Sequence, residues 1–132
     1  YACLEVVHST WTGYRFNLEQ NTADNSSAGQ VVIGPCLPVT DLMALDTVAV
    51  RLHDSSDHTL GQGVGADADG HPLDAVARLA RELVAFDQRL EAGDWVITGG
   101  LTKACALEPG GRLAGVFSVS GAWSIKVAAL RH

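Results

Sequence analysis

The sequence is poor in cysteine, methionine, aromatic residues and positive charge, and it lacks long apolar runs. Its 132 residues include three cysteines and one methionine, and aromatic residues make up only 6%. Lys and Arg number 9 against 15 Asp and Glu, so the net charge is −6, which argues against a nucleic-acid-binding protein. No apolar run approaches the roughly 18 residues that a transmembrane helix needs. We therefore expect neither a nucleic acid nor a membrane as partner.

The cysteines bear on the cellular compartment of the protein, and the single methionine bears on the position of the chain within its polypeptide. Cys3, Cys36 and Cys105 are odd in number, widely spaced and without a Cys-x-x-Cys pair, which favours a reducing cytoplasm over a disulfide framework. The only methionine is Met43, and the sequence opens directly on a strand-like run, 1–7. We expect the chain to be the carboxy-terminal part of a longer polypeptide.

Apolar residues make up 47% of the sequence, enough for the core of a single domain over residues 1–132. Short apolar or alternating runs bounded by turn residues predict several strands. These runs are 2–7, 30–33, 47–52, 58–64, 95–98, 113–119 and 123–130. Many short strands with one main helix indicate a β-rich α+β domain, either a roll or a sandwich.

The main helix is predicted at about residues 72–86. Pro72 suits the first helical position, and the preceding His71 is placed to cap the helix. An apolar stripe follows at spacings of three and four residues, which predicts a face packed on the sheet. The stripe consists of Leu73, Val76, Ala80 and Leu83.

Two further segments lie between the first predicted strands. Residues 11–18 alternate loosely, with Trp11, Tyr14, Phe16 and Leu18 as inward positions. Residues 21–29 are polar and small, a composition that predicts a loop held by bonds between side chains and the backbone.

Two further patterns suggest chemistry, but each has an ordinary structural explanation. Asp67-Ala68-Asp69 places two carboxylates two residues apart, which can serve a hard cation; it also precedes a helix, where acidic residues favour the helix dipole. The run 61–65 has three glycines but matches neither a dinucleotide-binding fingerprint nor a P-loop. Glycines at these positions indicate close packing of a strand.

Glu5 stands between Leu4 and Val6 in an apolar strand. If its side chain is buried, it must be hydrogen-bonded, paired or metal-bound, because an unpaired buried charge is costly. If the strand alternates strictly, Glu5 shares a face with Cys3 and Val7 and points to solvent. Both alternatives stay open at this level.

Four segments, taken together and in this order, resemble the fumarylacetoacetate hydrolase superfamily, and within it the branch of 2-keto-4-pentenoate hydratases and 4-oxalocrotonate decarboxylases. They are Leu4-Glu5-Val6-Val7-His8-Ser9, Thr22-Ala23-Asp24-Asn25-Ser26-Ser27, Gly70-His71-Pro72-Leu73-Asp74-Ala75-Val76 and Thr98-Gly99-Gly100-Leu101-Thr102. The resemblance covers nearly the whole chain but only the carboxy-terminal half of the family's chain. It implies the mixed β-roll or sandwich of that half.

The resemblance further implies a lyase, a decarboxylase or hydratase of small 2-oxo or 2-hydroxydienoic acids from the meta-cleavage of aromatic compounds. In the family, Mg²⁺ or Mn²⁺ is held by three carboxylates and polarises the 2-oxo group of the substrate. Glu5 matches the third of these ligands. Ser27 and Ser26 match a segment that binds the substrate carboxylate. Thr98 and Gly99 match the pocket lining, where glycines let backbone amides approach an anion.

The sequence also departs from the family pattern. His8 stands where the family has an aspartate, and Cys105-Ala106 replaces Val-Pro. The Glu-x-Glu strand that supplies two metal ligands and the amino-terminal catalytic lysine have no counterpart. We therefore expect half an active site, completed by an amino-terminal segment or by a chain that carries it, in a homo-oligomer or a mixed assembly. The alternative is a non-catalytic β-roll remnant that acts through association with a partner chain.

Overall fold

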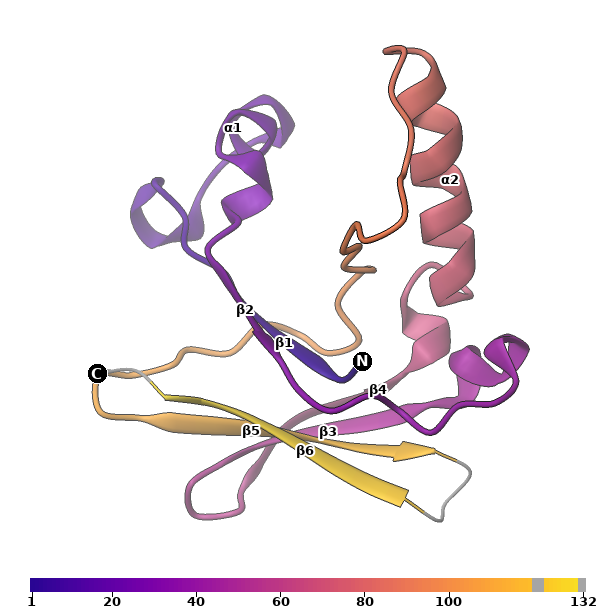
Figure 1. Cartoon of the computed structure of the whole chain (residues 1–132). Coiled ribbons are helices and arrows are strands. Elements are labelled where there is room, and N and C mark those ends of the chain that lie inside the picture. The colour runs from indigo at the N-terminus through magenta and orange to yellow at the C-terminus, as the bar shows by residue number, and fades with distance from the viewer. Residues whose placement is uncertain (120–122, 131–132) are drawn as a thin grey trace.

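The computed structural model describes residues 1–119 and 123–130. Two antiparallel sheets form the framework, one with two strands and one with four in the order β4-β3-β5-β6 (Figure 1). The strands are β1 (Cys3–Val6), β2 (Gln30–Ile33), β3 (Ala49–Asp54), β4 (Thr59–Val64), β5 (Arg112–Val119) and β6 (Trp123–Leu130). The helices are α1 (Leu18–Ala23) and α2 (Pro72–Val84). An α+β chain with antiparallel sheets and one main helix is thereby confirmed.

The core lies where the β1–β2 pair covers the four-stranded sheet. Its buried apolar residues are Ala2, Val48, Val50, Phe117 and Val119. Leu4 of β1 and its pairing partner Val32 of β2 pack against this cluster. A Cβ on Gly115 of β5 would lie only 3.0 Å from Cδ2 of Leu4, so the glycine lets the two layers approach closely.

The predicted strands at residues 2–7, 30–33, 47–52, 58–64, 113–119 and 123–130 are all present, with shifts of one or two residues at their ends. The last two pair in continuous antiparallel register from Arg112 opposite Leu130 to Val119 opposite Trp123. The glycine run on β4 is a packing feature, as predicted. A Cβ on Gly63 would lie 1.7 Å from the carbonyl oxygen of Leu101, a distance that no side chain tolerates.

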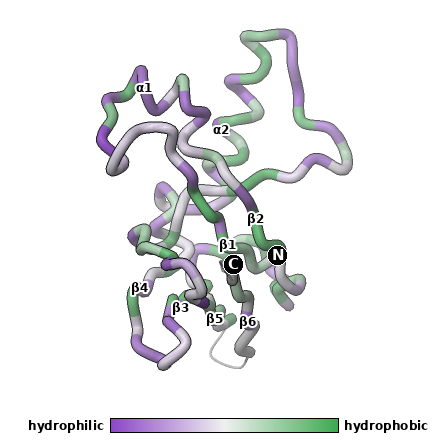
Figure 2. Tube along the Cα trace, turned by 90° about the vertical axis from the view of Figure 1, so that its left-hand side faces the viewer, coloured by the Kyte–Doolittle hydropathy of each residue, from purple (hydrophilic) through white to green (hydrophobic). Residues whose placement is uncertain are grey.

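Helix α2 begins as predicted and ends two residues earlier, at Val84. The amide of Leu73 donates to Nδ1 of His71 at 3.1 Å, so the histidine caps the helix. The prediction that the apolar stripe packs on the sheet is wrong, because no residue of α2 is buried. The helix extends away from both sheets (Figure 1), although hydrophobic residues recur along it (Figure 2). Amphipathic spacing identifies an apolar face, but it does not determine what covers that face.

The predicted strand at 95–98 is also wrong, since these residues have no strand pairing. The ring of Trp95 instead lies 5.1 Å from that of Tyr1, between ring centroids. A β-branched run favours a strand only where a neighbouring edge is available to pair with it. Here the segment between α2 and β5 passes by the start of β1 without joining either sheet.

The region 11–29 is more ordered than predicted. Tyr14, Phe16 and Leu18 are exposed rather than inward, and α1 occupies part of the expected loop. Asn17 and Gln20 start this helix with a reciprocal capping box, each side chain accepting from the other's backbone amide at 2.9 Å. Such a box supplies a helix start that loose alternation of apolar residues does not reveal.

Candidate active site

Glu5 lies in the middle of β1 on the face turned away from the core. It pairs with Val31 of β2, and both side chains are exposed. The neighbouring pair, Leu4 and Val32, points inward. The strand therefore alternates, which decides the question left open by the sequence in favour of a solvent-facing carboxylate. Its face also carries Ile33, an apolar side chain that is 48% exposed.

The described residues do not complete a metal site around this carboxylate. Within residues 1–119 and 123–130, no group of three His, Cys, Asp or Glu side chains lies close enough together to hold an ion. Mg²⁺ demands several oxygen ligands in octahedral geometry. Glu5 thus supplies one ligand at most, and the residues at hand do not fit the ion by themselves.

The Asp67 and Asp69 carboxylates have structural partners. Oδ2 of Asp67 accepts from the backbone amide of Val64 at 2.8 Å. Oδ2 of Asp69 pairs with Nη2 of Arg78 at 2.5 Å. Both oxygens are engaged in fixing the approach to α2, so the structural explanation of this acidic pair is favoured over the metal site.

Ser26 and Ser27 lie on a short turn after α1, here called the serine turn and defined as Asn25–Ser27. All three residues have positive φ angles, 49°, 56° and 59° in order. Successive left-handed residues other than glycine are unfavourable for L-amino acids. Ser27 is buried, with 4% of its surface exposed, whereas Ser26 is exposed. The turn is thus a strained segment that its surroundings must hold.

The carboxylate of Asp24 connects this turn to the end of β1. Oδ2 accepts from the hydroxyls of Ser9 at 2.7 Å and Ser27 at 3.1 Å. Oδ1 accepts from the hydroxyl of Thr10 at 2.9 Å, and the Thr10 amide also donates to the carboxylate. These bonds, that from Ser9 foremost, lower the pKa of Asp24 despite an opposing effect of burial. The amide of His8 donates to the carbonyl of Ser27 at 2.8 Å.

Sequence reasoning did not single out Asp24 for a role of its own. The signal that was available is an acidic residue directly before Asn-Ser-Ser, together with two adjacent hydroxyl residues, Ser9 and Thr10, just after a strand. Because the donors are fourteen and fifteen residues away, only the folded chain shows that they meet one carboxylate.

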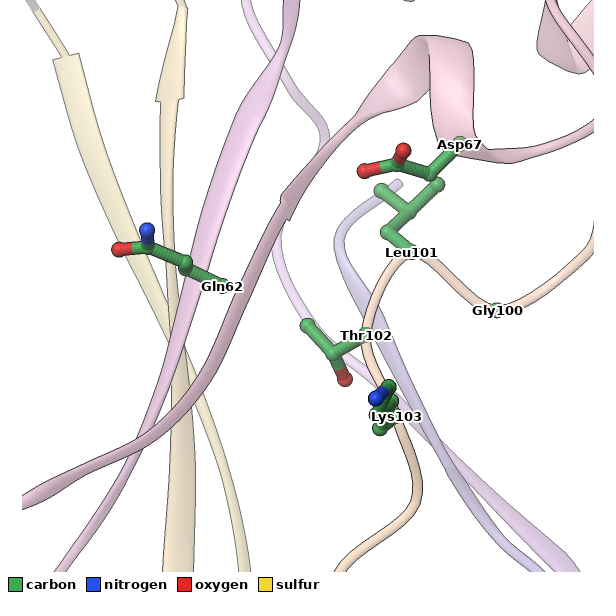
Figure 3. A pocket seen from close by; sticks show the side chains of 6 residues that line it. All are labelled: Gln62, Asp67, Gly100, Leu101, Thr102 and Lys103. Atoms are coloured by element: carbon green, nitrogen blue, oxygen red, sulfur yellow. The ribbon is translucent and has the colours of Figure 1, made fainter.

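Thr98 and Gly99 lie in the irregular segment between α2 and β5. Thr98 is half-buried and Gly99 is exposed, and a Cβ on Gly99 would make only an ordinary contact with Ala68, at 3.8 Å. The residues that follow, from Gly100 to Lys103, line a shallow open hollow of about 340 Å³ together with Gln62 and Asp67 (Figure 3). Gly100, the second residue of the glycine pair Gly99-Gly100, thus lines a hollow whose wall also holds the cationic Lys103.

Two of the predicted site residues, Glu5 and Ser27, lie on or beside β1. Ser27 contacts His8 just after the strand, and Trp95, three residues before Thr98, contacts Tyr1 just before it. Glu5 lies between, three residues from His8, or about 10 Å along an extended strand. Across the described part of the chain, no hydrogen bond joins Glu5, Ser27 and Thr98 directly. The structure therefore places Glu5 and Ser27 along β1, whereas Gly99 lies beside Ala68, and the described residues do not close these places into a single pocket.

The state of the cysteines and the character of the helices bear on the predicted cellular location. Cys3, Cys36 and Cys105 are free thiols, and the pKa of Cys105 is raised by burial. None of the helices in the described residues is long and apolar enough to cross a membrane. The cytoplasmic location inferred from the cysteines stays a prediction.

Comparison with known proteins gives relatives over nearly the whole chain, although no family model matches it. It is 34% identical over 125 residues to a 2-hydroxyhexa-2,4-dienoate hydratase of Comamonas testosteroni, covering 94% of this chain and 47% of the relative. It is 33% identical over 121 residues to a 4-oxalocrotonate decarboxylase of Pseudomonas putida, covering 89% and 46%. The chain spans about half the length of the curated relatives it matches.

The fold gives the same result. The solved structure of 4-oxalocrotonate decarboxylase from Pseudomonas putida G7, complexed with magnesium and adipate, matches with a TM-score of 0.82 and 28% identity. The match covers 94% of this chain and 46% of that one. This likeness agrees with a fold of the fumarylacetoacetate hydrolase type, while the choice between roll and sandwich stays a prediction. The resemblance read from the sequence motifs is confirmed: the chain is related to the 2-keto-4-pentenoate hydratases and 4-oxalocrotonate decarboxylases over about half of their length.

Proposed function

We propose that this chain is part of a divalent-metal-dependent lyase that acts on small 2-oxo or 2-hydroxydienoic acids of the aromatic meta-cleavage pathway. The reaction is either decarboxylation of 4-oxalocrotonate or hydration of 2-hydroxypenta-2,4-dienoate. The observation that carries the proposal is the joint agreement of sequence and fold with a decarboxylase whose structure holds magnesium and a linear dicarboxylate. The relatives are enzymes, so nothing favours a non-catalytic association module.

Within this proposal, Glu5 is one ligand of Mg²⁺ or Mn²⁺. Its carboxylate is exposed on the outer face of β1 and flanked by the exposed apolar side chains of Val31 and Ile33, so a further segment can cover it. Since one carboxylate does not hold Mg²⁺ tightly, the remaining ligands come from outside these 132 residues. They belong to an amino-terminal segment or to another chain of the assembly.

The proposal assigns the substrate carboxylate to the serine turn and to the glycine pair. Ser26 is exposed, whereas the hydroxyl of Ser27 already donates to Asp24; Ser26 is therefore the better placed of the two to donate to a substrate. Thr98 and Gly99 directly precede Gly100, which lines the hollow together with Lys103, and backbone amides beside glycines approach an anion without obstruction. All four residues remain candidates for binding a small 2-oxo acid.

The test follows the decrease in ultraviolet absorbance as a 2-hydroxydienoate or 2-oxo-3-hexenedioate is consumed at a fixed concentration of Mg²⁺ or Mn²⁺. The chain is assayed alone and together with a segment that carries the Glu-x-Glu strand and the lysine of a related decarboxylase. We expect the chain alone to show no turnover and to bind Mg²⁺ no tighter than roughly millimolar. The added segment should restore both, and size and intact-mass measurements then show whether the assembly is a homo-oligomer or contains two kinds of chain.

Glu5→Gln in the complete assembly tests the metal ligand. The variant should fold but lose at least about a hundredfold in kcat/KM, because an amide is a weaker ligand than a carboxylate. Glu82→Gln, on the exposed side of α2, is the matched control and should keep full activity. Unchanged activity in Glu5→Gln rules out the ligand, whereas full activity of the chain alone points to another site, with Asp67 and Asp69 the first to test. No turnover in any combination overturns the proposed function.

A further inference from the structure

We propose that Asp24 is a positioning residue, which holds the serine turn in the conformation that contacts the substrate. It acts through Ser27 and does not touch the substrate itself. The inference rests on the proposed function, in which the serine turn binds the carboxylate of a small 2-oxo acid.

The backbone of the serine turn is strained, although two backbone hydrogen bonds, from Ser27 to Asp24 and from Ala28 to Asn25, close it. Three successive residues other than glycine occupy the left-handed region, and such a conformation persists only when the surrounding structure over-determines it. The capping box of α1 lies at the start of that helix, at Asn17 and Gln20, and does not reach the turn. Besides the bonds of the turn's own backbone, the turn is connected to β1 through the Asp24 carboxylate, through the bond from the His8 amide to the Ser27 carbonyl, and through the β1–β2 pairing that begins at Gln30 opposite Val6.

The Asp24 carboxylate is suited to this task because it receives donors from two separate places. Ser9 and Thr10 approach from the end of β1, and Ser27 approaches from the turn. Hydrogen bonds to an ionised acceptor are stronger than those between neutral groups. One charge thereby connects the Ser27 side chain of the turn with the segment that follows β1, beside the backbone bond from His8 to Ser27.

The same bonds leave the exposed part of the turn available. The hydroxyl proton of Ser27 is committed to Asp24, and the hydroxyls of Ser9 and Thr10 are committed to the same carboxylate. Ser26, in the middle of the turn, is exposed. The buried side of the turn is therefore its anchor, and its exposed side is the surface on which a ligand can bind.

Asp24→Asn removes the anchor at nearly constant volume. An amide offers one acceptor oxygen and a donor in place of two acceptor oxygens, so it cannot accept from Ser9 and Ser27 on one side and from Thr10 on the other. Asp41→Asn is the matched control, because Asp41 accepts a single bond from the amide of Met43 at the start of another short helix.

The experiment uses the complete catalytic assembly with 2-oxo-3-hexenedioate as the probe. In Asp24→Asn we expect KM to rise about tenfold while kcat stays within about threefold, since the anchor serves binding rather than the chemical step. Amide hydrogen exchange of residues 25–28 should become at least about tenfold faster. Asp41→Asn should change neither. Ser9→Ala removes one donor and should shift both quantities in the same direction by less, which keeps the test valid if Asp24→Asn does not fold.

An unchanged KM in a folded Asp24→Asn assembly overturns the inference, and so does unchanged hydrogen exchange at the turn. A fall in kcat that matches the loss of folded protein, with KM constant, shows a structural residue only and also overturns it. A wild-type assembly without lyase activity overturns the proposed function and this inference with it. An active wild type with a normal KM in the variant overturns this inference alone.

Discussion

The four-stranded sheet and the serine turn are held by different forces. In the sheet, apolar side chains such as Val50 and Phe117 are buried between two layers, and the register continues without interruption along β5 and β6. In the turn, polar groups converge on one carboxylate, that of Asp24, and strained backbone angles are tolerated. Burial of apolar surface contributes free energy without regard to direction, whereas hydrogen bonds fix a geometry. The sheet therefore supplies stability, and the turn supplies a shaped surface.

Because most of the free energy of unfolding comes from apolar burial, substitutions in the two regions should differ in size and in pH dependence. The net contribution of a hydrogen bond to stability is only about 0.5–1.5 kcal/mol. The contribution of a bond to an ionised carboxylate is lost when the carboxylate is protonated.

The largest effect is expected in the sheet. Phe117→Ala should lower the free energy of unfolding by about 3–5 kcal/mol, because the truncation leaves a cavity among buried apolar neighbours. Val31→Ala, on the exposed face of β2, is the control and should cost less than about 1 kcal/mol. Urea denaturation measures both. A loss below about 1 kcal/mol for Phe117→Ala would mean that the sheet does not supply the stability.

A smaller effect is expected on α2. Leu83 is only half-buried, so Leu83→Ala should cost about 1 kcal/mol, well below the roughly 2–5 kcal/mol of a buried leucine. Val84→Ala, at a side chain that is 71% exposed, should have almost no effect. A cost above about 2 kcal/mol in the complete assembly would show that another segment covers the stripe of α2.

The smallest effect is the pH dependence of the turn. The pKa of Asp24 lies below its ordinary value of 3.8, with the Ser9 hydroxyl as the main cause. A group whose pKa is lower in the folded state stabilises that state above its unfolded pKa, and this contribution disappears as pH falls through the folded pKa. The melting temperature of the wild type should therefore fall more between about pH 6 and pH 3 than that of Asp24→Asn.

Asp54 provides an internal reference for that measurement. The pKa of Asp54 is also lowered, chiefly by the bond from the backbone amide of His58 in the β3–β4 turn. Its contribution to the stability of the folded state is therefore also lost as pH falls. Since Asp54 is present in both proteins, the difference between wild type and Asp24→Asn isolates the serine turn. Equal falls in melting temperature would show that the Asp24 bonds add no stability.

The candidate site could be predicted in part. The motifs suggested Glu5, Ser26, Ser27, Thr98 and Gly99 through their resemblance to a family; that relationship is confirmed, while the roles of these residues stay a prediction. The strand pairing then decided that Glu5 faces outward, because Leu4 and Val32 occupy the inner face. Asp24 escaped prediction because its donors, Ser9 and Thr10, are distant in sequence.

Local patterns predicted six of the seven expected strands and the start of the main helix, because period-two burial, proline at the first helical position and a capping residue are local features. Three features depend instead on long-range packing: 95–98 is not a strand, the apolar face of α2 stays half-covered, and three polar residues meet at Asp24. A local pattern specifies which face of an element is apolar or which group can donate. The partner of that face or group depends on where the rest of the chain passes, and no short-range pattern contains that information.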